Sequence, residues 1–569
     1  MKTSLLRKIS IVAATFWATT SEAQTLKWAK SLGGGDRSVG HAITVDASRN
    51  VITGGYFSGT VDMDPSATTA NLISATTSFD CYVQKLDSSG NLLWARRMGG
   101  DDDDETNALA ADASGNVYAA GYFNTSIDFD PLHSGTVTGV AAGAADFYVV
   151  KFSPSGNVLW AKTFGGSGND KATGLALDAA GNIFVTGTFE GTADFDPSAA
   201  TVARSSNGDR DIFVLKLSSS GSYVWVQTFG SVDADNGNAI ALDHANNVVV
   251  TGSFQNTVNF DPVSVHNLTA YGYGDVFILK LDNSGNYVWA GAVGGADYDD
   301  AGRGVAIDKA NNIFVTGIYR GDVDLNPGVA VDSFSWHSYN DVFLLKLTAS
   351  GTYAWARVMG GGSWDEGYAV TTDTFGNVYS TGYFGGSATF NEVGPVVLTS
   401  NGGSNVFIQK WSGAGVMVWA KSLEASGDDI GEAIATDASA NIYVTGQYSI
   451  VTDFDPNAAV VSITNSSAHS SSFILKWSSE EPAHPQGITE AEAEILRVYP
   501  IPANELLQVQ FKNAQRGVLT LFDLSGSIMY EQEIDGLATV VSLKDFAIGN
   551  YILNWKGEKG SKSMMISKM

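Results

Sequence analysis

Pairs of acidic residues spaced two apart recur along the chain, and they are the residues with the clearest capacity for chemistry. Four pairs have aspartate at both positions, and two pairs combine aspartate with asparagine. The pairs are Asp62/Asp64, Asp128/Asp130, Asp194/Asp196, Asp453/Asp455, Asn259/Asp261 and Asp324/Asn326. In an extended segment, residues i and i+2 point to the same side. Their oxygens suit Ca²⁺, which takes about six to eight oxygen ligands. One interpretation is therefore a set of calcium sites.

A second interpretation of the pairs needs no metal. A proline follows each of the six pairs, and aspartate or asparagine commonly stabilises a turn through its own side chain. The seventh equivalent, Thr389/Asn391, has neither an acid nor a following proline. The DxDxDG calcium loop with its downstream glutamate does not occur in the sequence. Structural turn and calcium site both remain open.

The elements that position these pairs follow from a long repeat. Seven tryptophans recur at intervals of 64 to 66 residues, each in a matching phrase such as "LLWARRMGG" or "VLWAKTFGG". They are Trp28, Trp94, Trp160, Trp225, Trp289, Trp355 and Trp419. So regular a period indicates one supersecondary unit repeated seven times.

Each repeat contains four short β-type runs. After Thr106 these are "ALAAD", "VYAAGYF", "FYVVKF" and "VLWAKTF", joined by two tight turns and one long middle loop. The turns "ASGN" and "SPSGN" contain glycine and asparagine, which adopt positive φ most easily. No helical period competes in these segments. Seven repeats of four antiparallel strands predict an all-β, seven-bladed β-propeller over residues 24–477.

The ends of the repeat region predict how the ring closes. The last repeat stops after its third strand, Ser472–Trp477, and a spare strand of the fourth type lies at Thr25–Gly34. We expect Leu26–Lys30 to pair with Phe473–Trp477 and complete the seventh blade. This pairing removes the exposed edges that an open array would have.

Charge separates the two faces of the predicted ring. Strand direction places the long middle loops and the connections between blades on one face, which we call the loop face. The acidic pairs begin the long loops, and connections such as "GGDDDDET" and "GGADYDDAG" are acidic too. The whole chain has 60 acidic and 33 basic residues, net −27. Such a surface repels nucleic acid and anionic membranes and favours cations or basic partners.

Two kinds of tryptophan have different expected roles. The seven repeated ones keep one register of the outer strand, which favours packing between blades over sugar binding. Trp336 and Trp364 lie in loops outside the repeat pattern. An exposed aromatic ring there is a platform for a sugar or a peptide, so we predict these two as ligand residues.

The repeats resemble the bacterial SBBP β-propeller repeat. The resemblance rests on phrases such as "DASGNVYAAG" (112–121) and "DAAGNIFVTG" (178–187), and it covers roughly residues 25–477. It implies the propeller fold and says little about activity, because such repeats occur mainly in exported proteins of unassigned role.

The two ends of the chain indicate export. Residues 1–23 combine Lys2, Arg7 and Lys8 with a short apolar stretch and a small-residue cleavage site, which predicts a secretory signal peptide. No stretch reaches the roughly 20 apolar residues of a membrane span, so we predict no transmembrane segment. An acidic linker, rich in Glu, Pro and Ser, is expected at 478–494.

Residues 495–569 break the repeat and form a second domain. Seven short alternating runs predict a small, Ig-like β-sandwich. The segment resembles the C-terminal sorting domain of the type IX secretion system of Bacteroidota, on "VYPIPANELLQV", "LTLFDLSGSIM" and "GNYILNWKG"; the usual asparagine after the first proline is Ile501 here. The resemblance implies recognition by the secretion machinery and release or attachment at the cell surface. The alternative is an accessory sandwich that binds carbohydrate.

Signals for catalysis are few. The seven histidines are scattered, and no HExxH, GxSxG, CxxC or P-loop pattern occurs. The single cysteine, Cys81, takes a position that is apolar in other repeats, which predicts a buried core residue. We therefore expect a secreted or cell-surface binding and scaffold protein whose loop face contacts glycans, proteins or cations. The alternative is a secreted propeller enzyme that acts on polysaccharide, as a lyase or a glycoside hydrolase.

Overall fold

The computed structural model describes two parts of the chain. The first is residues 24–478 without 35, 67–68, 132–136, 297, 338, 392–394, 456, 458–459, 466 and 468. The second is residues 495–568 without 500–505, 523–527, 545, 547–548 and 558–559. The predicted signal peptide and nearly all of the predicted linker lie outside these ranges. The chain divides into two compact units, residues 1–480 and 481–569.

The described residues of the first unit form antiparallel four-stranded sheets, which we number as blades one to seven. Blades one to three comprise β3 (Arg37–Val45), β4 (Val51–Ser58), β7 (Asp80–Leu86) and β8 (Leu92–Met98); β9 (Asp104–Ala111), β10 (Val117–Asp128), β11 (Thr138–Phe152) and β12 (Val158–Gly166); and β13 (Lys171–Leu177), β14 (Ile183–Asp194), β15 (Ala203–Leu217) and β16 (Tyr223–Phe229).

Blades four to seven follow the same order, innermost strand first. They comprise β17 (Asn236–Leu242), β18 (Val248–Phe254), β21 (Asp275–Leu281) and β22 (Tyr287–Gly295); β23 (Ala301–Ile307), β24 (Ile313–Tyr319), β27 (Asp341–Leu347) and β28 (Tyr353–Gly361); β29 (Asp365–Thr372), β30 (Val378–Asn391), β31 (Val396–Trp411) and β32 (Met417–Ser422); and β34 (Ile430–Thr436), β35 (Ile442–Tyr448), β38 (Ser471–Ser478) and β1 (Thr25–Ser31).

Short strands lie in the loops, and several of them pair across the boundary between neighbouring blades. They are β2 (Gly33–Gly34), β5 (Thr60–Asp62), β6 (Asn71–Ile73), β19 (Thr257–Asn259), β20 (Asn267–Thr269), β25 (Val323–Asp324), β26 (Ser333–Phe334), β33 (Glu424–Ala425), β36 (Val451–Asp453) and β37 (Ser462–Thr464). In the same way, the last residues of β12 in blade two pair with the end of β14 in blade three.

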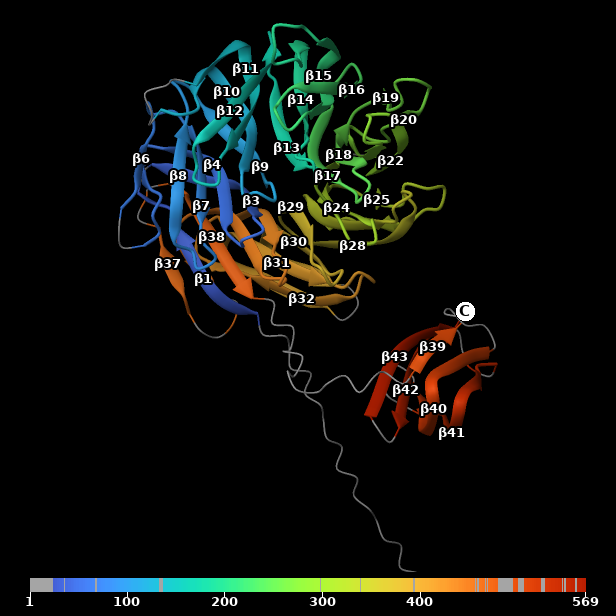
Figure 1. Cartoon of the computed structure of the whole chain (residues 1–569). Coiled ribbons are helices and arrows are strands. Elements are labelled where there is room, and N and C mark those ends of the chain that lie inside the picture. The colour runs from blue at the N-terminus through green and yellow to red at the C-terminus, as the bar shows by residue number, and fades with distance from the viewer. Residues whose placement is uncertain are drawn as a thin grey trace, which may run out of the picture. The chain divides into compact units, whose positions relative to one another are not determined.

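The blades form a closed ring. The innermost strands contact one another in the order β3, β9, β13, β17, β23, β29 and β34, and β34 returns to β3 (Figure 1). The N-terminal strand β1 pairs with β38, with Leu26 opposite Trp477 and Lys30 opposite Ile474. The predicted all-β propeller and its closing strand are confirmed, because the N-terminal strand supplies the fourth strand that the last repeat lacks.

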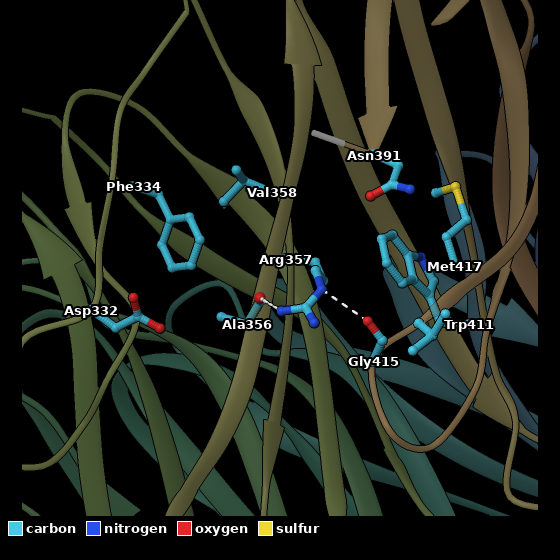
Figure 2. Close-up of a pocket in the computed structure, with 10 residues that line it drawn as sticks. Asp332, Phe334, Ala356, Arg357, Val358, Asn391, Trp411, Gly415 and Met417 are labelled. Carbon is cyan, nitrogen blue, oxygen red and sulfur yellow. Dashed lines mark hydrogen bonds between the residues drawn. The ribbon is translucent and has the colours of Figure 1, made fainter. Parts of the chain in front are cut away.

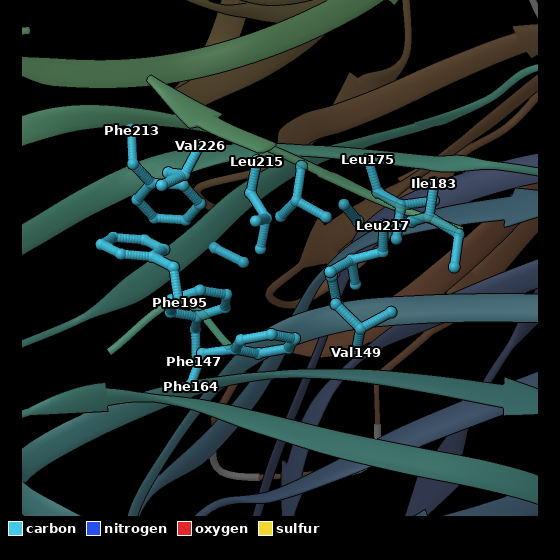
Figure 3. Packing of buried hydrophobic residues seen from close by; sticks show 14 of the residues in the cluster. Phe147, Val149, Phe164, Leu175, Ile183, Phe195, Phe213, Leu215, Leu217 and Val226 are labelled. Atoms are coloured by element: carbon cyan, nitrogen blue, oxygen red, sulfur yellow. The ribbon is translucent and has the colours of Figure 1, made fainter. Parts of the chain in front are cut away.

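The core lies between the blades, where the faces of neighbouring sheets meet. In one cluster, shown in Figure 3, Phe147 stacks on Phe164 and on Phe213, with ring centroids 4.8 Å and 4.7 Å apart. These rings come from blades two and three. Cys81 is fully buried in the neighbouring cluster, as its place in the repeat predicts.

The repeated tryptophans connect each blade to the next. Six of the indoles pack against the glycine in the last tight turn of the following blade, as Trp94 does on Gly156. Several also donate the indole N–H to a backbone carbonyl of that turn: Trp28 to Ser88, Trp94 to Pro154, Trp225 to Asn283 and Trp355 to Gly413. The predicted packing role of these tryptophans is therefore observed.

The described residues of the second unit form one five-stranded sheet: β39 (Ile495–Tyr499), β40 (Leu506–Phe522), β41 (Ile528–Ser542), β42 (Gly549–Gly557) and β43 (Gly560–Lys568). Seven predicted runs become five strands because two pairs of runs are continuous. β40 passes through a register shift between Gln510 and Gln515 without turning back, and β41 follows it. The sheet covers a core that includes Leu507, Leu521 and Trp555.

No described segment forms a helix that could cross a membrane.

Candidate functional site

The acidic pairs lie in turns on the loop face. Asp194 accepts a hydrogen bond from the backbone N–H of Asp196 (3.1 Å) and another from that of Val202 (2.8 Å) on the same oxygen, Oδ1. Asn259 accepts the equivalent two bonds, at 3.1 Å and 2.9 Å. An amide oxygen at this position thus accepts the same two backbone hydrogen bonds as a carboxylate oxygen. These contacts support the turn interpretation.

The same turn geometry recurs at the other described pairs. The first residue accepts from the N–H two positions on at Asp62, Asp128, Asp324 and Asp453. The second residue of a pair also accepts a hydrogen bond from a backbone N–H in four cases: Asp64, Asp196, Asp261 and Asp455. Both positions of a pair therefore help to hold the turn.

The Asp128/Asp130 pair forms the same turn and also lies near a cation of the protein. The backbone N–H of Asp130 donates to Oδ1 of Asp128 at 3.0 Å, so the two residues close a turn instead of presenting two free carboxylates to one ion. The Asp130 side chain is half-buried, and its charge acts on Arg96 of blade one. Burial lowers the pKa of Arg96, and the negative charge of Asp130 opposes that shift. A cation of the protein itself therefore lies within reach of the charge of Asp130.

The described surroundings of the pairs contain no ready-made metal cluster. Within the described ranges, no three His, Cys, Asp or Glu side chains are placed to share one metal ion, and this includes Asp128 and Asp130. The structure thus does not bring the predicted metal ligands together beyond the pairs themselves, because each pair stands in the turn of its own blade. Calcium binding by the pairs stays a prediction.

Four aromatic side chains form two linked ring pairs on the loop face, which we call the aromatic band: Tyr298, Trp336, Tyr339 and Trp364. The rings of Tyr298 and Trp336 are 6.0 Å apart between centroids, and those of Tyr339 and Trp364 are 5.6 Å apart. The indole N–H of Trp336 donates to the carbonyl of Tyr339 and joins the two ring pairs. The structure thus brings the two predicted tryptophans into one patch.

The aromatic band is partly open to solvent. Trp364 is 44% exposed and Tyr339 is 46% exposed. Trp336 is half-buried, because it packs against the core between blades four and five. The guanidinium carbon of Arg320 lies 4.1 Å from the ring centroid of Tyr298 and fixes the far end of the band. Trp336 is the fixed base, and Tyr339 and Trp364 present their rings.

Polar contacts lead from the aromatic band into the central channel. Asn340, the neighbour of Tyr339, donates its side-chain N–H to Glu366 (2.9 Å). Glu366 forms an ion pair with Arg303 (3.2 Å), and the Arg303 guanidinium lies 4.9 Å from the ring centroid of Tyr368. Hydrogen-bonding groups therefore continue from the aromatic band to the channel wall.

The channel is lined by one polar or charged residue from each blade, and we call these seven residues the channel ring. They are His41, Asn107, Thr173, Asn238, Arg303, Tyr368 and Glu432, and they border a cavity of about 440 Å³. Each is the extra residue of a β-bulge in the innermost strand, as the register shifts show. A bulge turns a side chain out of the regular alternation and re-aims it.

The channel ring carries charges of both signs. His41 Nδ1 lies 3.8 Å from a carboxylate oxygen of Glu432. Burial lowers the pKa of His41, but the hydrogen bond and charge of Glu432 outweigh burial, so the pKa is raised above its usual value. The channel ring was not among the features predicted from the sequence. The only sign of it in the sequence was a position between small residues that varies among the repeats, as in "GHA", "GNA" and "GRG".

A second cavity, of about 450 Å³, opens between blades five and six (Figure 2). Arg357 lies across it and donates to the carbonyls of Gly415 (3.0 Å) and Ala356 (2.6 Å). Its guanidinium also lies near the rings of Trp355 and Trp411, at 5.3 Å and 5.8 Å from their centroids. Because contacts within the protein already hold this arginine, we assign the cavity no ligand.

The closed ring of repeated sheets, with its channel ring and loop-face patch, defines a β-propeller protein. Residues 159–188 match the family model described as a beta-propeller repeat, SBBP, and residues 497–568 match the secretion system C-terminal sorting domain. The chain thus carries an SBBP β-propeller repeat and a type IX secretion C-terminal sorting domain, and the sorting domain indicates export to the cell surface or extracellular space.

Similarity to individual proteins is low. An uncharacterised WD repeat-containing protein of Acanthamoeba polyphaga mimivirus is 22% identical over 531 residues, or 79% of this chain and 37% of that protein. Regulatory protein FlaEY of Caulobacter vibrioides is 27% identical over 169 residues, or 29% of this chain and 17% of that protein. The chain therefore spans well under half the length of either relative.

Two solved structures are also similar. One is PorZ, a surface component of the type IX secretion system of Porphyromonas gingivalis, with 12% identity, a TM-score of 0.17 and coverage of 95% of this chain and 100% of that one. The other is a protein of unknown function from Bacteroides thetaiotaomicron, with 10% identity, a TM-score of 0.19 and coverage of 63% and 96%.

Proposed function

We propose that this protein is a non-enzymatic binding propeller, displayed on or released from the cell surface, that holds a glycan on the aromatic band. The observation that carries the proposal is the linked set of rings on one face, with Tyr339 and Trp364 exposed and Trp336 fixed beneath. Rigid aromatic rings provide large contact area at little cost in conformational entropy.

The surroundings of the aromatic band suit a hydroxyl-rich ligand. Arg320, Asn340 and Glu366 place donors and acceptors beside the rings and toward the channel. An aromatic platform bordered by hydrogen-bonding groups is the arrangement expected for a sugar, whose ring has apolar faces and polar edges. The predicted acid on the loop face disfavours anionic polysaccharides, so we propose a neutral or basic glycan.

The regularity of the repeats supports binding over catalysis. Tryptophan spacing varies by only two residues, from 64 to 66, and no blade carries a long insertion that would build a separate reaction site. We propose two partners for the chain. The secretion machinery binds residues 495–569, and the glycan binds the loop face.

A glycan screen on the chain from residue 24 onward tests this proposal. We expect binding of a neutral or basic glycan that is lost in the double variant Tyr339→Ala/Trp364→Ala. Phe375→Ala is the matched control, because Phe375 is also exposed (62%) but lies in a tight turn between the first two strands of blade six. Release of sugar fragments in a parallel assay would instead favour the enzyme alternative.

A further inference from the structure

Neighbouring blades meet at buried pairs of aspartates that the functional site does not use. One member lies in the third strand of a blade, and the other lies at or just before the first strand of the next blade. The pairs are Asp80/Asp104, Asp146/Asp170, Asp211/Asp235, Asp275/Asp300 and Asp341/Asp365. We call them junction pairs. In one of them, the Asp170 N–H donates to the carbonyl of Ala145 at 2.7 Å, so the two acids are neighbours across the junction.

The two members differ in their hydrogen bonds. Both oxygens of Asp170 accept backbone N–H groups, from Gly166 (2.7 Å) and Glu190 (3.1 Å). Asp146 accepts one N–H, from Ala142, on Oδ2 at 3.1 Å. Its buried Oδ1 has no hydrogen-bond partner. A buried polar atom without a partner costs free energy, so an additional group is expected at this oxygen.

The same unpartnered oxygen recurs in five junctions. It is Oδ1 of Asp80, Asp146, Asp211, Asp275 and Asp341, and each of these residues is at most 4% exposed. Because the same unfavourable unpartnered oxygen occurs at five junctions, chance placement of the side chains is a poor explanation for it.

A glycine marks where the unpartnered oxygen points. A Cβ placed on Gly165 would lie 2.4 Å from Oδ1 of Asp146 and 2.9 Å from Oδ2 of Asp170. Oxygens of both acids therefore converge on the same point. Gly230 and Gly294 hold the equivalent place beside Asp211 and Asp275. A Cβ on Gly230 or Gly294 would collide with the carboxylate of Asp211 or Asp275, so each of these carboxylates lies directly against its glycine.

In two of the junction pairs a basic side chain of the chain lies against one acid. Arg97 forms an ion pair with Asp80, and Nδ1 of His337 lies 3.0 Å from Oδ2 of Asp341. Among the described residues, no basic side chain pairs with either acid of the other three: Asp146/Asp170, Asp211/Asp235 and Asp275/Asp300. The charged groups that act on Asp170, Asp235 and Asp300 are further acids, including Glu190, Asp233 and Asp299.

We propose that these three junctions, between blades two and three, three and four, and four and five, each bind a Ca²⁺ ion. The unpartnered oxygen and the facing carboxylate supply hard oxygen ligands from two blades, and the ion supplies a counter-charge, as Arg97 does beside Asp80. Buried carboxylates without a counter-charge are strongly disfavoured. Two acids per ion leave the remaining positions to water and backbone carbonyls, which Ca²⁺ accepts more readily than Mg²⁺ does.

The test is a count of bound calcium and a melting curve on the whole chain from residue 24. We expect three Ca²⁺ ions to be retained in equilibrium dialysis at neutral pH, with a higher melting temperature in calcium than in magnesium or EDTA at equal ionic strength. The triple variant Asp146→Asn/Asp211→Asn/Asp275→Asn should lose the three ions and the calcium-dependent shift. Asparagine fits this position, because Asn405 already holds it in blade six.

Two further variants keep the outcome decisive. If the triple variant does not fold, Asp211→Asn alone should bind one ion fewer. Asp128→Asn/Asp130→Asn, in a loop-face turn, should keep all three ions. Equal melting of the unchanged chain in calcium and EDTA would overturn the proposal and leave the junction pairs to share protons. Loss of calcium from the turn variant alone would also overturn it, in favour of the loop-face pairs.

Discussion

The indole N–H of Trp28 donates to the carbonyl oxygen of Ser88 at 3.2 Å, across 60 residues of sequence. Trp28 lies in the N-terminal strand of blade seven, and Ser88 lies in the last tight turn of blade one. The contact is the same one that links other blades, such as that of Trp94 with Pro154. The strand that closes the ring is therefore bonded as an ordinary fourth strand.

Removing this link should destabilise the ring. Trp28→Ala removes the indole bond and the packing on Gly90, and we expect a loss of about 2 kcal/mol, below the roughly 3–5 kcal/mol of a fully buried tryptophan. Deleting residues 24–32 should lower the melting temperature further or cause aggregation, because β38 becomes an exposed edge. Chemical denaturation measures both, with Trp364→Ala as the exposed control. An unchanged deletion mutant would contradict closure by β1.

Stability should fall as the pH rises. Burial raises the pKa of Asp104 to about 8, despite two backbone N–H donors, and Asp80 and Asp102 add like charge. The unfolded value is about 3.9. The folded state therefore binds more protons, and this group's stabilisation is present below about pH 4 and lost as the pH rises through about 8.

The measurement for Asp104 is denaturant unfolding in EDTA across this pH range. Asp104→Asn should reduce the slope of the free energy of unfolding against pH, whatever it does to the absolute stability. An identical slope in the variant would show that Asp104 titrates normally in the folded protein.

Substitutions of Asp194 distinguish the turn interpretation of the acidic pairs from the calcium interpretation. Asn259 makes the same two hydrogen bonds in blade four, so the turn interpretation expects Asp194→Asn to be nearly silent. Asp194→Ala should cost about 1–2 kcal/mol, because two buried or half-buried N–H groups lose their acceptor. Melting in calcium and in EDTA checks both. A calcium-dependent shift that Asp194→Asn removes would establish the pair as a metal ligand.

We expect the C-terminal domain to direct transport of the chain across the outer membrane. A chain that ends at Trp477 is expected to remain in the periplasm, because the predicted signal peptide serves only the inner membrane. Residues 478–569 fused to an unrelated periplasmic protein should carry it outward. Cell fractionation and surface labelling measure both. Surface exposure of the truncated chain would contradict the prediction and favour the accessory-sandwich alternative.

Sequence periodicity predicted the parts of the structure that repeat. The period of the tryptophans and the missing last strand were enough to predict the propeller and the partner of Leu26. Repetition at one register was also enough to predict that Trp94 and its equivalents pack between blades. Each of these rests on local patterns that recur in every blade.

The remaining features depend on contacts between blades or on small backbone changes. The bulge that aims Arg303 and Tyr368 into the channel leaves only a variable position in the sequence. The sequence places Asp146 and Asp170 at the edges of strands. That the two residues are neighbours across a junction follows only from the closed ring. In the second unit, β40 continues where a turn was expected because its register shift is absorbed within the strand.

The most direct test of the account is the affinity of the best glycan from the screen for the chain with Trp364→Ala. We predict at least a tenfold increase in Kd, or about 1.4 kcal/mol, because Trp364 is the exposed tryptophan of the aromatic band. Phe375→Ala should stay within about twofold, and both variants should melt like the unchanged protein. Equal affinity of the Trp364→Ala chain and the unchanged chain would contradict glycan binding on the aromatic band.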